Sequence, residues 1–263
     1  MQKTALITGA ARGIGLATAE LFQANGYHVA ILDRDAEALS AAAAQLPEAE
    51  PMLFDLALPE TAAEVAKQIK EKFGALAALV NNAGVADFGP IEDCDPAMWR
   101  NVMDTNLDGM FYLTQALTPQ LKAGGGSVVN IASISGLRAS TLRVAYGTSK
   151  AAVMQLSKQQ AVELGEYGIR VNCVAPGWVH TEMAEEALRT DGAKISASFT
   201  SPVNGSQLFS FGYEQTLRKG PSVDTLKSDL VAKYGEPDET NSRGNVWTYH
   251  LVSQRPRRPI GAW

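Results

Sequence analysis

The 263-residue sequence has little of several residue types, and each scarcity argues against a class of site. Its only cysteines, Cys94 and Cys173, lie far apart in apolar surroundings, which predicts buried, reduced thiols rather than a disulfide or a metal pair. Its three histidines show no ligand spacing with the cysteines or with one another. We therefore expect no structural metal.

Long hydrophobic runs and an excess of basic charge are also missing. No stretch of eighteen apolar residues occurs, and the first residues lack the basic, apolar and small-residue layout of a signal peptide. A net charge of -5 does not supply the concentrated basic face that nucleic-acid binding requires. We therefore expect a cytoplasmic protein with neither a membrane nor a nucleic acid as partner.

What is present is a regular alternation of apolar and amphipathic segments over the first two thirds of the chain. The expected strands cover residues 4–8, 27–33, 51–56, 75–84, 127–133 and 169–176. The expected helices run from a glycine-rich turn to about residue 25 and over 36–45, 61–73, 96–121 and 143–167. Nearly continuous apolar strands alternating with helices predict a parallel sheet covered on both faces. The expected fold class is α/β, with three layers and a doubly wound, Rossmann-like sheet.

The pattern stops after about Met183, where the sequence becomes polar and rich in Ser, Thr, Asn and Gly. The net charge changes from -8 over residues 1–186 (13 Lys and Arg, 21 Asp and Glu) to +3 over residues 187–263 (10 and 7). Within the second part, residues 222–234 indicate an amphipathic helix and residues 245–252 a strand. We expect one domain over residues 1–186. An atypical segment over 187–263 follows it and resembles a small α+β appendage.

A glycine-rich segment, TGAARGIG at residues 8–15, lies between the first expected strand and the first helix. Glycines at this position let the backbone approach a pyrophosphate at a helix N-terminus. Asp33 ends the second strand, where a carboxylate accepts hydrogen bonds from ribose hydroxyls and repels a 2′-phosphate. This favours NAD over NADP as the cofactor, although Arg34 could pair with a 2′-phosphate.

Tyr146 and Lys150 lie four positions apart in YGTSK, and Ser133 precedes the tyrosine by thirteen residues. On a helix, residues i and i+4 share one face, so the phenol and the ammonium can point into the same cleft. A fixed ammonium favours the phenolate and lowers the tyrosine pKa, which makes Tyr146 a candidate acid/base. Such a pair also arises by chance on solvated helices, so the other motifs decide whether this one belongs to a catalytic site.

Together the motifs resemble those of the classical short-chain dehydrogenases/reductases, over about residues 3–183. They are TGAARGIG, Asp55, NNAG at 81–84, Asn106, Ser133, YGTSK at 146–150, and PG at 176–177 followed by Thr181. The resemblance implies an NAD(H)-dependent oxidoreductase that interconverts a secondary alcohol and a carbonyl. It also implies that residues 1–186 form a dinucleotide-binding and catalytic domain.

The resemblance implies a role for each of the four catalytic residues. Tyr146 exchanges a proton with the substrate oxygen, and Lys150 holds the nicotinamide ribose and lowers the tyrosine pKa. Ser133 donates a hydrogen bond to the substrate oxygen. Asn106 lies at a helix kink that holds a water between the lysine and bulk solvent.

The resemblance further implies a set of residues that bind the cofactor. They are Gly9, Arg12, Gly13, Ile14, Gly15, Asp33, Asp55, Leu56, Asn82, Ala83, Gly84, Tyr146, Lys150, Pro176, Gly177, Val179 and Thr181. Asp55 is expected near the adenine or, alternatively, as a solvated cap before the next helix. The Val179 backbone and the Thr181 hydroxyl are expected to hold the nicotinamide amide. Arg138 and Arg143 either border the substrate or are solvated.

The resemblance fails after residue 183, where the family has a substrate-covering helix pair, a last helix and a seventh strand. A divergent lid, a fused or swapped module and a replaced native end all remain open. The expected substrate is a small alcohol or carbonyl compound, and the family implies a homodimer or homotetramer. The alternative is a non-catalytic nucleotide-binding or interaction protein, in which the altered C-terminus prevents turnover.

Overall fold

The computed structural model describes residues 2–177, 179 and 181–183, together with the backbone of strands at 193–199, 208–215, 239–240 and 247–248. The chain divides into two compact units, Met1–Thr190 and Asp191–Trp263. The predicted helix over residues 222–234 lies outside the described residues. So does the predicted strand over 245–252, apart from residues 247 and 248.

The first unit contains a sheet of six parallel strands in the order β3-β2-β1-β4-β5-β6. The strands are β1 (Thr4–Thr8), β2 (His28–Asp33), β3 (Glu50–Leu53), β4 (Ala78–Asn81), β5 (Ser127–Ile131) and β6 (Arg170–Val174). The chain winds from β1 outwards to β3 and then returns to β4 on the other side of β1. This doubly wound parallel sheet confirms the predicted fold class.

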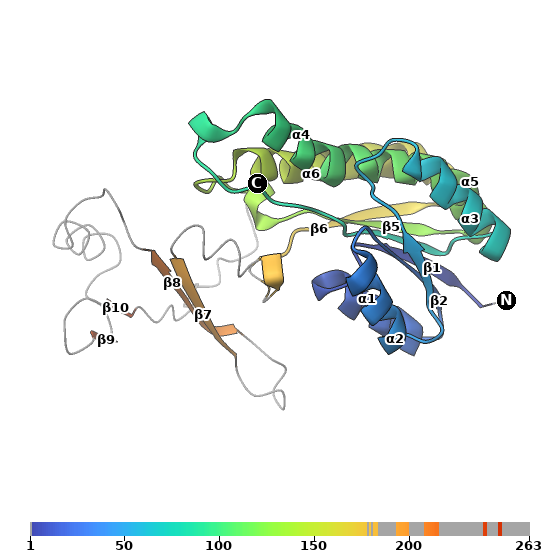
Figure 1. Ribbon diagram of the computed structural model, residues 1–263, viewed down its shortest axis with the longest axis horizontal. Coiled ribbons are helices and arrows are strands. Elements are labelled where there is room, and N and C mark those ends of the chain that lie inside the picture. The colour runs from blue at the N-terminus through green and yellow to red at the C-terminus, as the bar shows by residue number, and fades with distance from the viewer. Residues whose placement is uncertain are drawn as a thin grey trace, which may run out of the picture. The chain divides into compact units, whose positions relative to one another are not determined.

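Helices cover both faces of this sheet, with α1 and α2 on one face and α3, α5 and α6 on the other (Figure 1). The helices are α1 (Gly13–Ala24), α2 (Ala36–Gln45), α3 (Thr61–Phe73), α4 (Pro96–Met103), α5 (Gly109–Gly124) and α6 (Val144–Gly165). Two 3₁₀ turns, η1 (Ile91–Asp93) and η3 (Ile134–Gly136), lie in the loops after β4 and β5. A π-helical turn, η2 (Asp104–Asp108), separates α4 from α5, so the helix predicted over 96–121 is interrupted near its middle.

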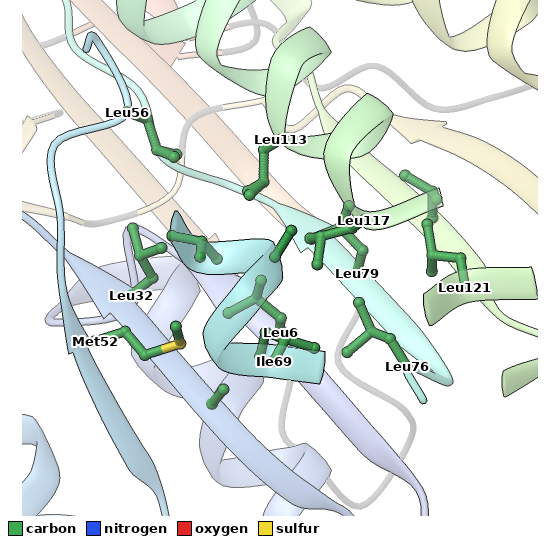
Figure 2. Packing of buried hydrophobic residues seen from close by; sticks show 14 of the residues in the cluster. Leu6, Leu32, Met52, Leu56, Ile69, Leu76, Leu79, Leu113, Leu117 and Leu121 are labelled. Carbon is green, nitrogen blue, oxygen red and sulfur yellow. The ribbon is translucent and has the colours of Figure 1, made fainter. Parts of the chain in front are cut away.

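The alternation of side chains along the central strands explains why these strands are apolar throughout. On β1, Leu6 packs into the core beneath α3 and α5, whereas Ala5 and Ile7 pack into the core beside α1 and α2. Figure 2 shows the first core, which includes Leu6, its register partner Leu79 on β4, and Leu117 on α5. Each fully buried leucine contributes about 1.5–3 kcal/mol relative to an exposed one.

The described strands of the second unit form two antiparallel pairs. Strands β7 (Ala193–Phe199) and β8 (Leu208–Gln215) pair with each other, as do β9 (Glu239–Thr240) and β10 (Trp247–Thr248). Strand β10 falls within the segment predicted to be extended.

The cysteine prediction is half confirmed. Both thiols are free, but Cys94 is half-buried and Cys173 is exposed, so the prediction of buried thiols was wrong. Cys173 lies on β6, which is at the edge of the six-stranded sheet.

None of the helices in the part of the chain that the structure describes combines the length and apolar character of a transmembrane span.

Candidate active site

The predicted motifs meet at one edge of the sheet because they follow the carboxyl ends of parallel strands. The glycine-rich loop follows β1, Asp33 ends β2, and NNAG begins at the end of β4. Ser133 follows β5, and the PG loop follows β6. The strand order reverses between β1 and β4. Open α/β sheets bind ligands at the carboxyl ends of the strands, at such a point of reversal.

The loop after β1 approaches the rest of the site closely. Gly9 and Gly13 have positive φ values of 61° and 56°. A Cβ atom at Gly15 would lie 2.1 Å from the Gly9 carbonyl oxygen, and one at Gly9 would lie 2.8 Å from Ala83 Cα. Helix α1 begins at Gly13, within this glycine-rich segment, and its N-cap residue, Arg12, makes no side-chain cap hydrogen bond. The first-turn N–H groups around Ile14 are thus not capped by that side chain, so the loop fits a pyrophosphate.

Thr8 ties this loop to NNAG. Its hydroxyl oxygen accepts hydrogen bonds from the backbone N–H of Asn82 (3.0 Å) and Ala83 (2.9 Å). The Asn82 side-chain amide donates to the carbonyl oxygens of Thr8 (2.9 Å) and Gly9 (3.1 Å). Thr8 is buried, and sequence reasoning did not single it out, although its place as the polar last residue of an apolar strand was a usable signal.

The carboxylates after β2 and β3 have defined partners. Asp33 Oδ2 accepts from the backbone N–H of Ala11 (3.1 Å), and Oδ1 accepts from that of Asp35 (3.1 Å). Asp55 Oδ1 accepts from the backbone N–H of Ala57 (3.0 Å), as a turn cap does. Asp55 Oδ2 lies 3.6 Å from Arg34 Nη1.

Leu56 is only 7 % exposed and packs in the core with Leu113 and Leu117. Leu56 is a predicted cofactor-binding residue, but its side chain packs in the hydrophobic core.

Arg12 links the glycine-rich loop to two other segments. Its guanidinium pairs with Asp35, the N-cap residue of α2, and with Glu182 at 2.8 Å. The hydrogen bond with Glu182 is the main cause that raises the Arg12 pKa.

The PG loop also comes close to the glycine-rich loop. The Thr181 Cγ2 atom lies 3.3 Å from where a Cβ of Gly13 would be, and the Pro176 carbonyl oxygen accepts from Ile134 N–H (2.9 Å). Gly177 and Val179 belong to the same loop, and the Val179 side chain is exposed.

The Ser133 side chain is near enough to the Tyr146 phenol to lower its pKa by hydrogen bonding. Ser133 Oγ also accepts from the backbone N–H of Ser135 at 3.1 Å, which fixes the serine at the start of η3. Burial raises the Tyr146 pKa above its ordinary value, while the Ser133 hydrogen bond and the charge of Arg143 lower it by less. Arg143 is held with its Cζ 5.2 Å from the centroid of the Phe88 ring.

Lys150 lies one turn after Tyr146 on α6 and is 3 % exposed. Its ammonium donates a hydrogen bond to the Ile131 carbonyl oxygen at 2.8 Å, and it lies 5.8 Å from the centroid of the Tyr146 ring. Burial lowers the Lys150 pKa to about 8. The two side chains therefore share a face as predicted. The net direction of the Tyr146 pKa is opposite to the one predicted, because burial outweighs the favourable contacts.

Asn106 lies in the π-helical turn and is completely buried. Its Oδ1 accepts from Val85 N–H (2.8 Å), and its Nδ2 donates to the Val85 carbonyl (2.9 Å) and to Ser149 Oγ (3.0 Å). The Ser149 hydroxyl in turn donates to the Tyr146 carbonyl (2.8 Å). Asn106 thus joins the loop after NNAG to the helix that carries Tyr146, through two residues that sequence reasoning missed.

Gly84 completes this arrangement. A Cβ atom at this position would lie 3.2 Å from Asn106 Oδ1 and 3.3 Å from Lys150 Nζ. The last residue of NNAG therefore lies directly beside two of the predicted catalytic residues, Asn106 and Lys150.

Comparison with known proteins gives one consistent family. A model of the short chain dehydrogenases matches residues 3–192. Galactitol 2-dehydrogenase of Agrobacterium fabrum is 40 % identical over 183 residues, which are 68 % of this chain and 72 % of that enzyme. Trans-4-hydroxycyclohexanecarboxylate dehydrogenase of Sinomonas cyclohexanicum is 40 % identical over 193 residues, or 69 % and 74 % of the two chains.

A solved structure agrees with these relatives. The crystal structure of NAD⁺-bound xylitol dehydrogenase superposes with a TM-score of 0.69 at 33 % identity, and the match covers 72 % of this chain and 75 % of that one.

Proposed function

The chain belongs to the short-chain dehydrogenase family, and we propose that it transfers hydride between NAD(H) and a secondary alcohol or its carbonyl, with Tyr146 as the acid/base. The family membership makes it an oxidoreductase acting on alcohol or carbonyl substrates. The observation that carries the finer proposal is the buried Lys150 ammonium, which lies one turn after Tyr146 on α6 and donates a hydrogen bond to the Ile131 carbonyl oxygen, on the strand that leads into Ser133. We further propose that residues 1–186 contain all of this machinery and that residues 187–263 are a separate appendage.

The nicotinamide, when bound, accepts a hydride from the substrate carbon or returns it. Tyr146 takes the hydroxyl proton during oxidation and gives a proton to the carbonyl oxygen during reduction. Because burial raises its pKa, Tyr146 is a neutral phenol at pH 7 and is ready to donate for reduction. Ser133 donates a hydrogen bond to the substrate oxygen as negative charge develops on it.

The rest of the cleft supports dinucleotide binding. Gly9, Gly13 and Gly15 allow the loop to pack closely on Asn82, Ala83 and Thr181, and we propose that the pyrophosphate binds at the start of α1, where the Arg12 side chain makes no cap hydrogen bond. We propose that Lys150 holds the nicotinamide ribose. Asp33 favours NAD over NADP, because its carboxylate accepts from ribose hydroxyls and repels a 2′-phosphate.

The test is turnover by the purified full chain. The protein is mixed with NAD and a panel of polyols and secondary alcohols that begins with galactitol and xylitol, and the absorbance of the reduced cofactor is followed. We expect formation of reduced cofactor with at least one member of the panel. A thermal shift with NAD but no turnover in either direction would instead identify a non-catalytic nucleotide-binding protein.

A further inference from the structure

Arg34 and Asp55 lie together because of the register between two neighbouring strands. Strands β2 and β3 pair in parallel with Asp33 opposite Leu53, and the Phe54 N–H continues the pairing by donating to the Asp33 carbonyl oxygen (3.0 Å). Where the chains leave the sheet, Arg34 Nη1 lies 3.6 Å from Asp55 Oδ2. At this distance the contact is an ion pair rather than a hydrogen bond.

The position of Arg34 gives this ion pair a consequence for cofactor choice. Arg34 directly follows Asp33, the carboxylate proposed to bind the adenosine ribose. A guanidinium at this position is a natural partner of a 2′-phosphate, which it can bind through paired, charge-assisted hydrogen bonds. Pairing with Asp55 places an opposite charge 3.6 Å from that guanidinium and draws it towards the end of β3.

A second cation near this part of the cleft, Arg12, is also paired. Arg12 contacts Asp35 and Glu182, so it has two carboxylate partners, whereas Arg34 has one ion pair within the described residues. Removing a carboxylate from Arg12 therefore leaves a second one in place. Removing Asp55 leaves Arg34 without the ion pair that the structure shows.

We propose that Asp55 is a second determinant of cofactor specificity, which holds Arg34 in an ion pair and so denies a 2′-phosphate the cation that would bind it. Asp33 repels the 2′-phosphate, and Asp55 keeps Arg34 from binding it. This inference rests on the proposed function, because it requires a dinucleotide in this cleft.

The test measures the dissociation constants of NAD and NADP by calorimetry on the full chain. Asp55→Asn removes the charge but keeps an oxygen that can accept from Ala57 N–H. Asp33→Asn serves as the background, so that repulsion by Asp33 does not mask the effect. In that background we expect Asp55→Asn to raise the affinity for NADP relative to NAD by about tenfold, since a charge-assisted contact is gained. Adding Arg34→Gln should cancel the gain.

Asp35→Asn, made in the same background, is the matched control. It removes the same charge one residue from Arg34 and keeps an N-cap side chain for α2, and Arg12 retains Glu182. We expect a smaller change in the NADP to NAD ratio, below about threefold.

Two sets of results overturn the inference while leaving the proposed function intact. One is normal NAD binding with a ratio that Asp55→Asn does not change. The other is a gain that survives Arg34→Gln or that Asp35→Asn reproduces in full. Failure of the wild-type chain to bind either dinucleotide would overturn the proposed function together with the inference. Contacts of Asp55 with the adenine do not affect the ratio, because the two cofactors share that base.

Discussion

Lys150 donates a hydrogen bond from its buried ammonium to the carbonyl oxygen of Ile131, the last residue of β5, at 2.8 Å. The contact fixes α6 against the strand that leads into Ser133. It also places a cation in a buried site, where burial lowers its pKa to about 8. The lysine therefore positions the helix that carries Tyr146 and has a charge that depends on pH in the mildly alkaline range.

Replacing Lys150 with methionine should change how stability depends on pH. Between about pH 8 and the ordinary lysine pKa of 10.5, the folded wild-type chain loses a proton that the unfolded chain still binds. Stability rises with pH wherever the unfolded state binds more protons, so the wild-type chain gains stability over this window relative to Lys150→Met. The expected gain is on the order of 3 kcal/mol.

Urea unfolding of both chains at pH 7 and at pH 10.5 measures this difference. Titrating groups far from Lys150 contribute equally to both chains and cancel. A difference in unfolding free energy that stays constant between these pH values would show that Lys150 is not buried as described.

The pH dependence of alcohol oxidation should respond to Arg143. Tyr146 must lose its proton before it can accept one from the substrate, so oxidation by the free enzyme should rise with pH. The charge of Arg143 lowers the tyrosine pKa, so Arg143→Gln should move the rise in kcat/KM to higher pH.

Arg138→Gln is the control for this shift, because Arg138 is exposed and its charge does not contribute to the shift of the Tyr146 pKa. Its pH profile should match that of the wild-type chain. If the pH profile of Arg143→Gln matches that of the wild-type chain, the charge of Arg143 does not lower the Tyr146 pKa.

A methyl group at Gly136 should disturb the site through the backbone. The added Cβ of Gly136→Ala would lie 2.7 Å from Ala151 N and from the Lys150 carbonyl carbon, so η3 must move away from α6. We expect a loss of about 1–3 kcal/mol in stability and a lower kcat, because Ser133 moves relative to Tyr146.

Gly165→Ala provides the comparison, at the end of α6, the helix on which η3 packs. Nothing lies within 4 Å of the added Cβ, and alanine favours the helix by about 0.5–1 kcal/mol. Chemical denaturation and steady-state kinetics on both variants measure the two effects. Unchanged stability and kcat in Gly136→Ala would contradict the close packing of η3 on α6.

Much of the fold was predictable because local signals and tertiary packing agree. Helix α3 has the predicted bounds, since Val65 and Ile69 form one buried face of a strongly amphipathic segment. The position of each strand in the sheet was harder to predict, because apolar patterning does not show which strand lies at the edge. For that reason Cys173 on β6 was expected to be buried and is exposed.

The site was predictable at the level of motifs but not of their partners. Strand ends and helix spacing indicated Ser133, Tyr146 and Lys150. The roles of Thr8 and Ser149 depend on contacts with residues 74 and 43 positions away, which spacing within a motif does not reveal. The direction of the Tyr146 pKa was missed for a similar reason, because it depends on how deeply the packed chain buries the phenol.

The most direct test of the central claim compares the wild-type chain with Tyr146→Phe. Both are assayed for reduction of NAD by the best alcohol substrate and, separately, for NAD affinity. Removing the phenol oxygen should lower kcat at least about 100-fold, the contribution of a general acid/base, while the affinity for NAD stays within about threefold. Turnover by Tyr146→Phe at the wild-type rate would contradict the assignment of Tyr146 as the acid/base.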